Sequence, residues 1–174
     1  MGSCLFLLLE PSGVWGKTEK EQTSFDADPS RQITRPVPLP DSVLQILAQD
    51  SEVVACRKEN PIPRGASLAS WFVASEIHLD EAGEADLVVL PVAEGNRFLC
   101  FHSAEGIGWF WVFHQVRAHY DLVLKTAGLG LTVRDARHNG FRDIQSGMAF
   151  GTHSSETTYH FENGKYREYR SEAQ

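Results

Sequence analysis

Long apolar runs and an excess of basic residues are both missing from this chain of 174 residues. No stretch approaches the roughly 20 consecutive apolar residues that a membrane-spanning helix needs, so we expect no membrane span. Lys and Arg number 16 against 23 Asp and Glu, which gives a formal net charge of -7. A nucleic-acid-binding surface has to be basic, so this balance argues against a nucleic-acid partner. The acidic balance permits a cationic protein as a partner. We expect the chain itself to be a monomer.

The local motifs that mark common catalytic and metal sites are also missing. The seven histidines form no HExxH pair, and neither a GxSxG turn nor a glycine-rich phosphate loop occurs. The three cysteines show no CxxC spacing. Motifs therefore predict no catalytic residue and no cofactor, and they favour a protein that is not an enzyme.

A catalytic site could still be assembled from residues on separate strands. Four histidines lie in segments that we predict to be strands: His78, His102, His114 and His160. If they converge beside a carboxylate in a concave pocket, the alternative function is a hydrolase or another enzyme with a His, Asp and Glu site on the sheet.

Residues 1–36 are expected to form a leader that is disordered or loosely attached. Residues 10–36 are polar and charged, so they should not bury enough apolar surface to offset the entropy cost of ordering. The apolar segment Leu5–Leu9 resembles part of a truncated secretory signal, although no Lys or Arg precedes it. Residues 37–174 then form a single domain, and deleting the leader should leave the thermal stability of that domain nearly unchanged.

The rest of the sequence predicts an α+β domain, mainly an antiparallel β-meander sheet with one N-terminal helix packed against it. Residues 41–50 carry apolar side chains at helical spacing, with Asp41 as the expected N-cap. From residue 70 onward the apolar pattern is typical of strands, and residues 97–101 are expected to form one of them. Residues 107–116 are apolar on both faces, which predicts a central strand.

Two Asn-Gly dipeptides predict tight β-hairpin turns. They stand at Asn139-Gly140 and Asn163-Gly164. Both residue types tolerate the positive φ angles that such turns need, so each dipeptide should connect two antiparallel strands.

Oxygen-bearing side chains around the first of these turns suggest a cation site. Asp135, Asn139 and Asp143 are spaced four residues apart, and Gly140 follows the second of them. Short calcium loops use this type of spacing because alternate side chains project into the turn. The three residues are the predicted metal ligands of a weak calcium-binding structural domain, which is a further alternative function. A turn held by its own hydrogen bonds explains the same pattern.

Cys56 and Cys100 are either two buried thiols or a disulfide pair. An exported protein folds under oxidising conditions, and in that case the two Cα atoms should lie less than about 7 Å apart.

The pattern over roughly residues 70–170 resembles a group of small exported bacterial domains with no assigned activity. Four segments carry the resemblance: Asp86-Leu-Val-Val89, Trp109-Phe-Trp-Val-Phe113, Asn139-Gly-Phe-Arg-Asp-Ile144 and Asn163-Gly-Lys-Tyr166. The resemblance implies an α+β sheet domain in the periplasm or outside the cell, with the cytoplasm as the alternative location. The segment from Asp135 to Asp143 also resembles the acidic loops of integrin-like propeller repeats, with Arg137 at a ligand position.

The leading interpretation of these observations is a non-catalytic binding or inhibitor-like module of an exported bacterial protein. Aromatic side chains that one face of the sheet could display are its predicted partner-binding residues: Trp109, Trp111, Tyr159 and Tyr166. Small exported acidic proteins rich in strands include inhibitors of cationic enzymes, and this is an analogy of size and charge.

Overall fold

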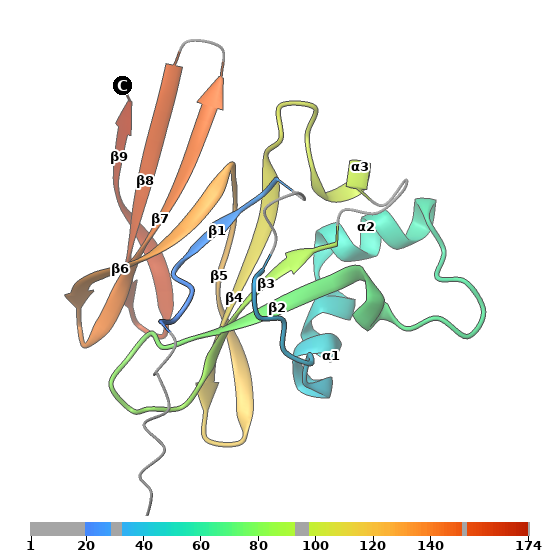
Figure 1. Cartoon of the computed structure of the whole chain (residues 1–174), viewed down its shortest axis with the longest axis horizontal. Coiled ribbons are helices and arrows are strands. Elements are labelled where there is room, and N and C mark those ends of the chain that lie inside the picture. Colours follow the sequence, from blue (N-terminus) through green and yellow to red (C-terminus); the bar gives the residue numbers. More distant parts are fainter. Residues whose placement is uncertain (1–19, 29–32, 93–97, 151–152, 174) are drawn as a thin grey trace, which may run out of the picture.

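The computed structural model describes residues 20–28, 33–92, 98–150 and 153–173, and within them nine strands form two antiparallel sheets (Figure 1). The first sheet has the order β2 (Phe72–Ile77), β3 (Asp86–Pro91), β4 (Gly108–Val116) and β5 (His119–Gly128). The second sheet has the order β1 (Ser24–Asp26), β6 (Gly130–His138), β7 (Phe141–Phe150), β8 (His153–Glu162) and β9 (Lys165–Ala173). The α+β class with a sheet-rich core is confirmed, but two sheets replace the single predicted sheet.

Two helices of nine residues pack beside the four-stranded sheet: α1 (Asp41–Gln49) and α2 (Ser51–Glu59). Asp50 separates them, and its side-chain oxygen caps α2 by accepting the backbone N–H groups of Glu52 and Val53. Asp41 does not cap α1, because Pro40 occupies the N-cap position and Asp41 lies in the first turn. The prediction of one N-terminal helix is therefore wrong, since two helices form and both follow β1 in the chain. No helix in the described part of the chain is long and apolar enough to cross a membrane.

The four-stranded sheet is buried on both faces. Val88 and Leu90 of β3 belong to the core between the two sheets, whereas Leu87 and Val89 belong to the core under the helices. Successive side chains of a strand point to opposite faces, so a strand covered on both sides has a continuous apolar sequence. Strand β4 lies between β3 and β5, which confirms the central strand predicted for residues 107–116.

The chain leaves the first sheet for the second at Gly128. Strand β5 ends there and β6 begins at Gly130, yet the two strands are not neighbours in either sheet. A Cβ atom at Gly128 would lie 2.7 Å from the carbonyl oxygen of Gly147 and would also collide with Ser146 Oγ. The sheets thus approach more closely here than any side chain allows. An unbroken series of strand patterns does not indicate such a crossing, and the prediction of one continuous meander failed for this reason.

The predicted leader is wrong for the part of it that the structure describes. Strand β1 pairs with β6, with Phe25 opposite Leu131, and Phe25 is only 3% exposed. Ala27 and Ile33 are buried in the same core. Three apolar residues in a polar segment are enough to anchor it, so the domain includes residues on the N-terminal side of residue 37. The signal-like segment Leu5–Leu9 lies outside the described residues.

A disulfide joins Cys56 of α2 to Cys100 of α3 (Phe98–Phe101), with the two Cα atoms 5.4 Å apart. This separation satisfies the limit of about 7 Å that a bridge requires. Residues 98–101 form this short helix instead of the predicted strand. A 3₁₀ turn, η2 (Leu68–Trp71), leads into β2 and completes the helical layer.

Candidate functional site

Both Asn-Gly turns form as predicted, and they bring polar side chains of the second sheet together. Asn139 and Gly140 have φ values of 52° and 83° between β6 and β7, and Asn163 and Gly164 have values of 51° and 82° between β8 and β9. The two hairpins therefore place the ends of four neighbouring strands side by side.

Asp143 of β7 and His160 of β8 are adjacent on the face of this sheet that points away from the core. Ile144 pairs with Tyr159, and Ile144 is buried between the sheets. Asp143 precedes Ile144 and His160 follows Tyr159, so both side chains project from the opposite face. His138 at the end of β6 reaches the same place beside the first hairpin turn.

The four side chains His138, Asp143, His160 and Tyr169 form what we call the histidine cluster. Nδ1 of His138 lies 2.7 Å from Oδ1 of Asp143, and Nε2 of His160 lies 3.5 Å from Oδ2 of the same carboxylate. The two imidazole rings stack with their centroids 3.5 Å apart, and the Tyr169 ring stacks on His160 at 4.0 Å. One carboxylate thus contacts two imidazoles in a three-ring stack.

Burial differs sharply within the histidine cluster. The side chains of Asp143 and His160 are 6% and 8% exposed, whereas that of His138 is 48% exposed. Tyr169 is 67% exposed, and it is one of two exposed large hydrophobic residues in the described part of the chain. The cluster therefore has two buried polar side chains, Asp143 and His160, beneath two accessible rings, His138 and Tyr169. Such an arrangement suits ligand binding.

The predicted calcium ligands do not come together. Asp135 accepts a hydrogen bond from Arg142 Nη2 at 3.1 Å, and Asn139 at the turn donates its side-chain N–H to the carbonyl oxygen of Phe161 at 2.8 Å. Only Asp143 of the three belongs to the histidine cluster. The three residues therefore do not form one ligand set, because they lie on two strands and a two-residue turn and not in a single loop.

All four predicted partner-binding aromatics lie in the cores or pack against them. Trp111 and Tyr166 are buried, and Tyr159 is partly buried with its hydroxyl 2.9 Å from that of Thr126. Trp109 is partly buried and lies under the ammonium group of Lys125. The prediction of a displayed aromatic face is wrong because two sheets and a helical layer provide cover for both faces of the central strands.

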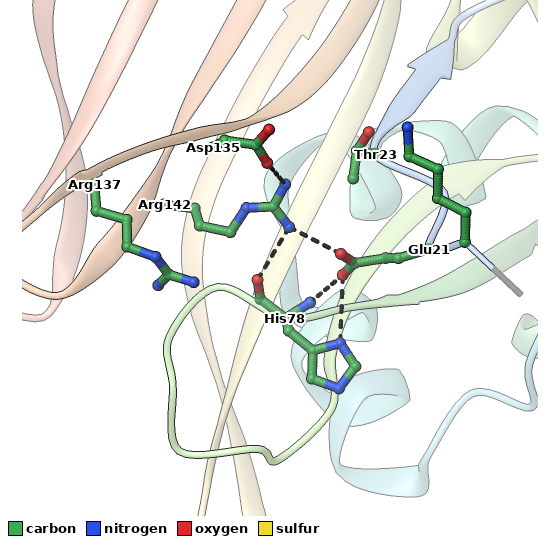
Figure 2. A pocket seen from close by; sticks show the side chains of 7 residues that line it. Glu21, Thr23, His78, Asp135, Arg137 and Arg142 are labelled. Carbon is green, nitrogen blue, oxygen red and sulfur yellow. Dashed lines mark hydrogen bonds and ion pairs between the residues drawn. The ribbon is translucent and has the colours of Figure 1, made fainter. Parts of the chain in front are cut away.

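A charged pocket of about 470 Å³ lies between the end of β2, the N-terminal segment and the β6–β7 hairpin (Figure 2). Its lining residues are Lys20, Glu21, Thr23, His78, Asp135, Arg137 and Arg142. Arg142 occupies its centre and is buried.

Every N–H group of the Arg142 guanidinium already has an acceptor. Nη1 donates to Glu21 Oε2 at 2.9 Å and to the His78 carbonyl, and Nη2 donates to the Val133 carbonyl and to Asp135. Nε donates to the carbonyl oxygen of Arg134 at 2.8 Å. A guanidinium has five donors, and these contacts use all of them. Arg142 therefore holds the pocket walls together and has no donor left for a ligand.

A second His–Asp contact lies at the start of β3, where the carboxylate is fully buried. Asp86 is 0% exposed and accepts hydrogen bonds from the backbone N–H groups of Leu79 and Gln115 and, at 2.8 Å, from Nδ1 of His114. Burial raises the pKa of Asp86 above its ordinary value, against the opposing effect of these hydrogen bonds. The His114 ring packs edge-on against Phe141. The contacts of Asp86 therefore hold the connection between β2 and β3 against β4.

Asp86→Asn should lower stability, and the loss should shrink as pH rises. The amide nitrogen of Asn cannot accept, so one buried donor now served by Asp86 loses its acceptor, at a cost of about 1–3 kcal/mol. A raised native pKa means that the native chain keeps its proton at pH values where the unfolded chain has lost it. The natural chain therefore loses stability relative to the non-titrating variant as pH rises from about 4 through the native pKa.

Urea unfolding of both chains between pH 4 and pH 7 measures this difference directly. Asp121→Asn is the matched control, since Asp121 is exposed and also lies near a histidine, His119. A difference between the Asp86→Asn and natural chains that widens as pH rises would show that the native state favours the Asp86 carboxylate over its protonated form.

The four histidines of the predicted strands do not form one site. His78, His114 and His160 each contact a different carboxylate, and His102 lies beside Gly108 at the start of β4. Sequence reasoning missed the contribution of His138, and it did not place Tyr169 beside His160. The Asn139-Gly140 turn was the available signal, because it fixes which residues of β6 and β7 lie opposite one another.

Comparison with protein-family models, with curated proteins and with solved structures finds no match to this chain. The side chains of the histidine cluster and its surroundings are therefore the basis for inferring function.

Proposed function

We propose that this chain is a non-catalytic binding module of an exported protein, and that it binds an acidic oligosaccharide on the face of β8 and β9 around Tyr169. The observation that carries the proposal is the exposed ring of Tyr169, held in place by its stack on His160. A fixed aromatic ring that stands in solvent loses little entropy when a ligand ring packs on it.

A β-bulge displays this ring. Glu168 pairs with Tyr159 and Arg170 pairs with Thr158, which leaves Tyr169 between them as the extra residue of β9. Bulges of this kind redirect a side chain and are frequent next to binding sites.

An arginine near Tyr169 is suited to bind an anionic ligand. Arg167 is exposed and pairs with His160, so it lies on the face that carries the histidine cluster. Guanidinium groups bind carboxylates through paired hydrogen bonds. This local chemistry fits an acidic sugar better than the cationic protein that the net charge of -7 permits.

Two further observations support a non-catalytic, exported module. In the part of the chain that the structure describes, the His114 and His138 rings hydrogen-bond to carboxylates. No Ser, Thr or Cys side chain there bonds to either ring as an activated nucleophile would. The Cys56–Cys100 disulfide supports an oxidising compartment outside the cytoplasm.

Calorimetric titration with hexagalacturonate tests the proposal. We expect saturable binding that weakens as salt is raised, and Tyr169→Ala should weaken it about fivefold to tenfold, which corresponds to the loss of one ring stack. Val54→Ala is the matched control, because Val54 of α2 is the other exposed large hydrophobic residue of the described chain.

The outcome discriminates between ligand classes as well. Equal affinity for poly-glutamate would mean that charge alone is recognised and that the ring contributes nothing. No binding of hexagalacturonate at millimolar concentration, or equal affinity in Tyr169→Ala, would overturn the proposal.

A further inference from the structure

We propose that His138, Asp143 and His160 bind a divalent transition-metal ion, with Zn²⁺ as the best fit. One ligand atom from each residue lies within 4.8 Å of the other two. The three residues come from the neighbouring strands β6, β7 and β8, so the sheet fixes their relative positions.

The separations of the ligand atoms are close to those around a bound ion. Ligands of zinc at about 2.0–2.1 Å in a tetrahedral arrangement lie about 3.3–3.5 Å from one another. Oδ2 of Asp143 and Nε2 of His160 are 3.5 Å apart. Oδ1 of Asp143 and Nδ1 of His138 are 2.7 Å apart, so each oxygen of the carboxylate faces one imidazole. To reach the spacing of zinc ligands, the closer pair would have to separate by less than 1 Å.

The chemistry of the ligands selects the class of metal. Two imidazole nitrogens and one carboxylate oxygen suit zinc, copper, nickel or iron, whereas calcium takes six to eight oxygens and magnesium an octahedron of oxygens. The exposed side of His138 leaves the remaining coordination positions open to water.

Charge gives an independent reason. The Asp143 side chain is 6% exposed, and its contacts in the described part of the chain are two imidazoles, with no Arg or Lys in an ion pair with it. Burial of a carboxylate is costly unless a positive charge compensates it. A divalent ion between the three side chains would supply that charge.

Binding requires one movement. A metal ion lies in the plane of each imidazole that ligates it, but the rings of His138 and His160 are parallel within 15° and stacked at 3.5 Å. The ring of His138 must therefore leave the stack. Its position beside the hairpin turn and its half-exposed side chain permit this rotation, while Tyr169 can keep His160 in place. Imidazole and carboxylate groups ligate a metal ion in their deprotonated forms, so affinity should fall as pH is lowered.

Calorimetric titration of the untagged full chain with ZnCl₂ at pH 7.5 tests the site. We expect one ion per chain, a release of protons, and at zinc concentrations of 100 times Kd a rise of about 5–10 °C in the thermal midpoint. CaCl₂ and MgCl₂ should produce no such rise. Co²⁺ should give the visible absorption of a low-coordinate nitrogen and oxygen site.

His138→Gln is the decisive variant because its side chain is exposed and its loss should leave the fold intact. It should weaken zinc binding at least tenfold, whereas His119→Gln, at an exposed histidine beside Asp121, should not. Equal zinc affinity in His138→Gln and the natural chain, or an equal loss in His119→Gln, would overturn the site. Zinc is titrated without oligosaccharide, so this test and the test of the binding module can fail separately.

Discussion

A chain that starts at Val37 should unfold at least about 10 °C below a chain that starts at Lys20, or should fail to fold at all. The segment between these two starts carries Phe25, which lies in the core between the sheets. Loss of a buried Phe side chain alone costs about 3–5 kcal/mol. At about 2–4 °C per kcal/mol for a protein of this size, that loss accounts for the expected shift. Ile33 and the ion pair from Glu21 to Arg142 are lost as well.

Thermal unfolding followed by circular dichroism measures the shift. Phe25→Ala in the longer chain should reproduce most of it, and Ser24→Ala on the exposed side of the same strand should change the midpoint by no more than about 1–2 °C. Two equally stable chains would mean that β1 is dispensable and that the domain starts near residue 37.

Arg142→Lys should destabilise the protein by about 3 kcal/mol although it preserves the charge. Lysine has three donors in place of five, so at least two of the present acceptors lose their partner. Hydrogen bonds to a buried charged group are worth about 1.5–3 kcal/mol each. The acceptors include the carboxylate of Glu21 and main-chain carbonyls on β6 and on the segment after β2, so the loss weakens the joint between the two sheets.

Equilibrium unfolding in urea checks this expectation, with Arg167→Lys as the control. Arg167 is an exposed arginine on β9, and its replacement should change the free energy of unfolding by less than about 0.5 kcal/mol. If Arg142→Lys behaves like Arg167→Lys, the five hydrogen bonds of Arg142 do not contribute measurably to stability.

The features of this fold that could be predicted from sequence are those that depend on residues close together in the chain. The Asn-Gly turns follow from the φ angles that these residues tolerate, and the central strand β4 follows from its two apolar faces. Both features depend on a few neighbouring residues, and both are confirmed.

The parts that could not be predicted depend on partners far away in the chain. Phe25 looks like an isolated apolar residue in a polar segment until β6 provides its place in the core. In the same way, His138 and Tyr169 become neighbours only through two hairpins and a β-bulge. The spacing of residues along the sequence predicts neither the bulge nor the stacking of the rings. The sequence therefore indicates Asp143 and His160 separately, one as a calcium ligand and the other as a strand histidine, and does not bring them together.

The pairing of β1 with β6 also sets the order of events while the chain is being made. The ion pair from Glu21 to Arg142 spans 121 residues. At roughly 5–20 residues per second, a ribosome needs on the order of 10 seconds to synthesise the second partner after the first. Until β6 has been made, β1 lacks its partner strand. The N-terminal segment thus stays accessible to chaperones during most of translation, and the second sheet can complete its packing on the first only after its last strands have been made.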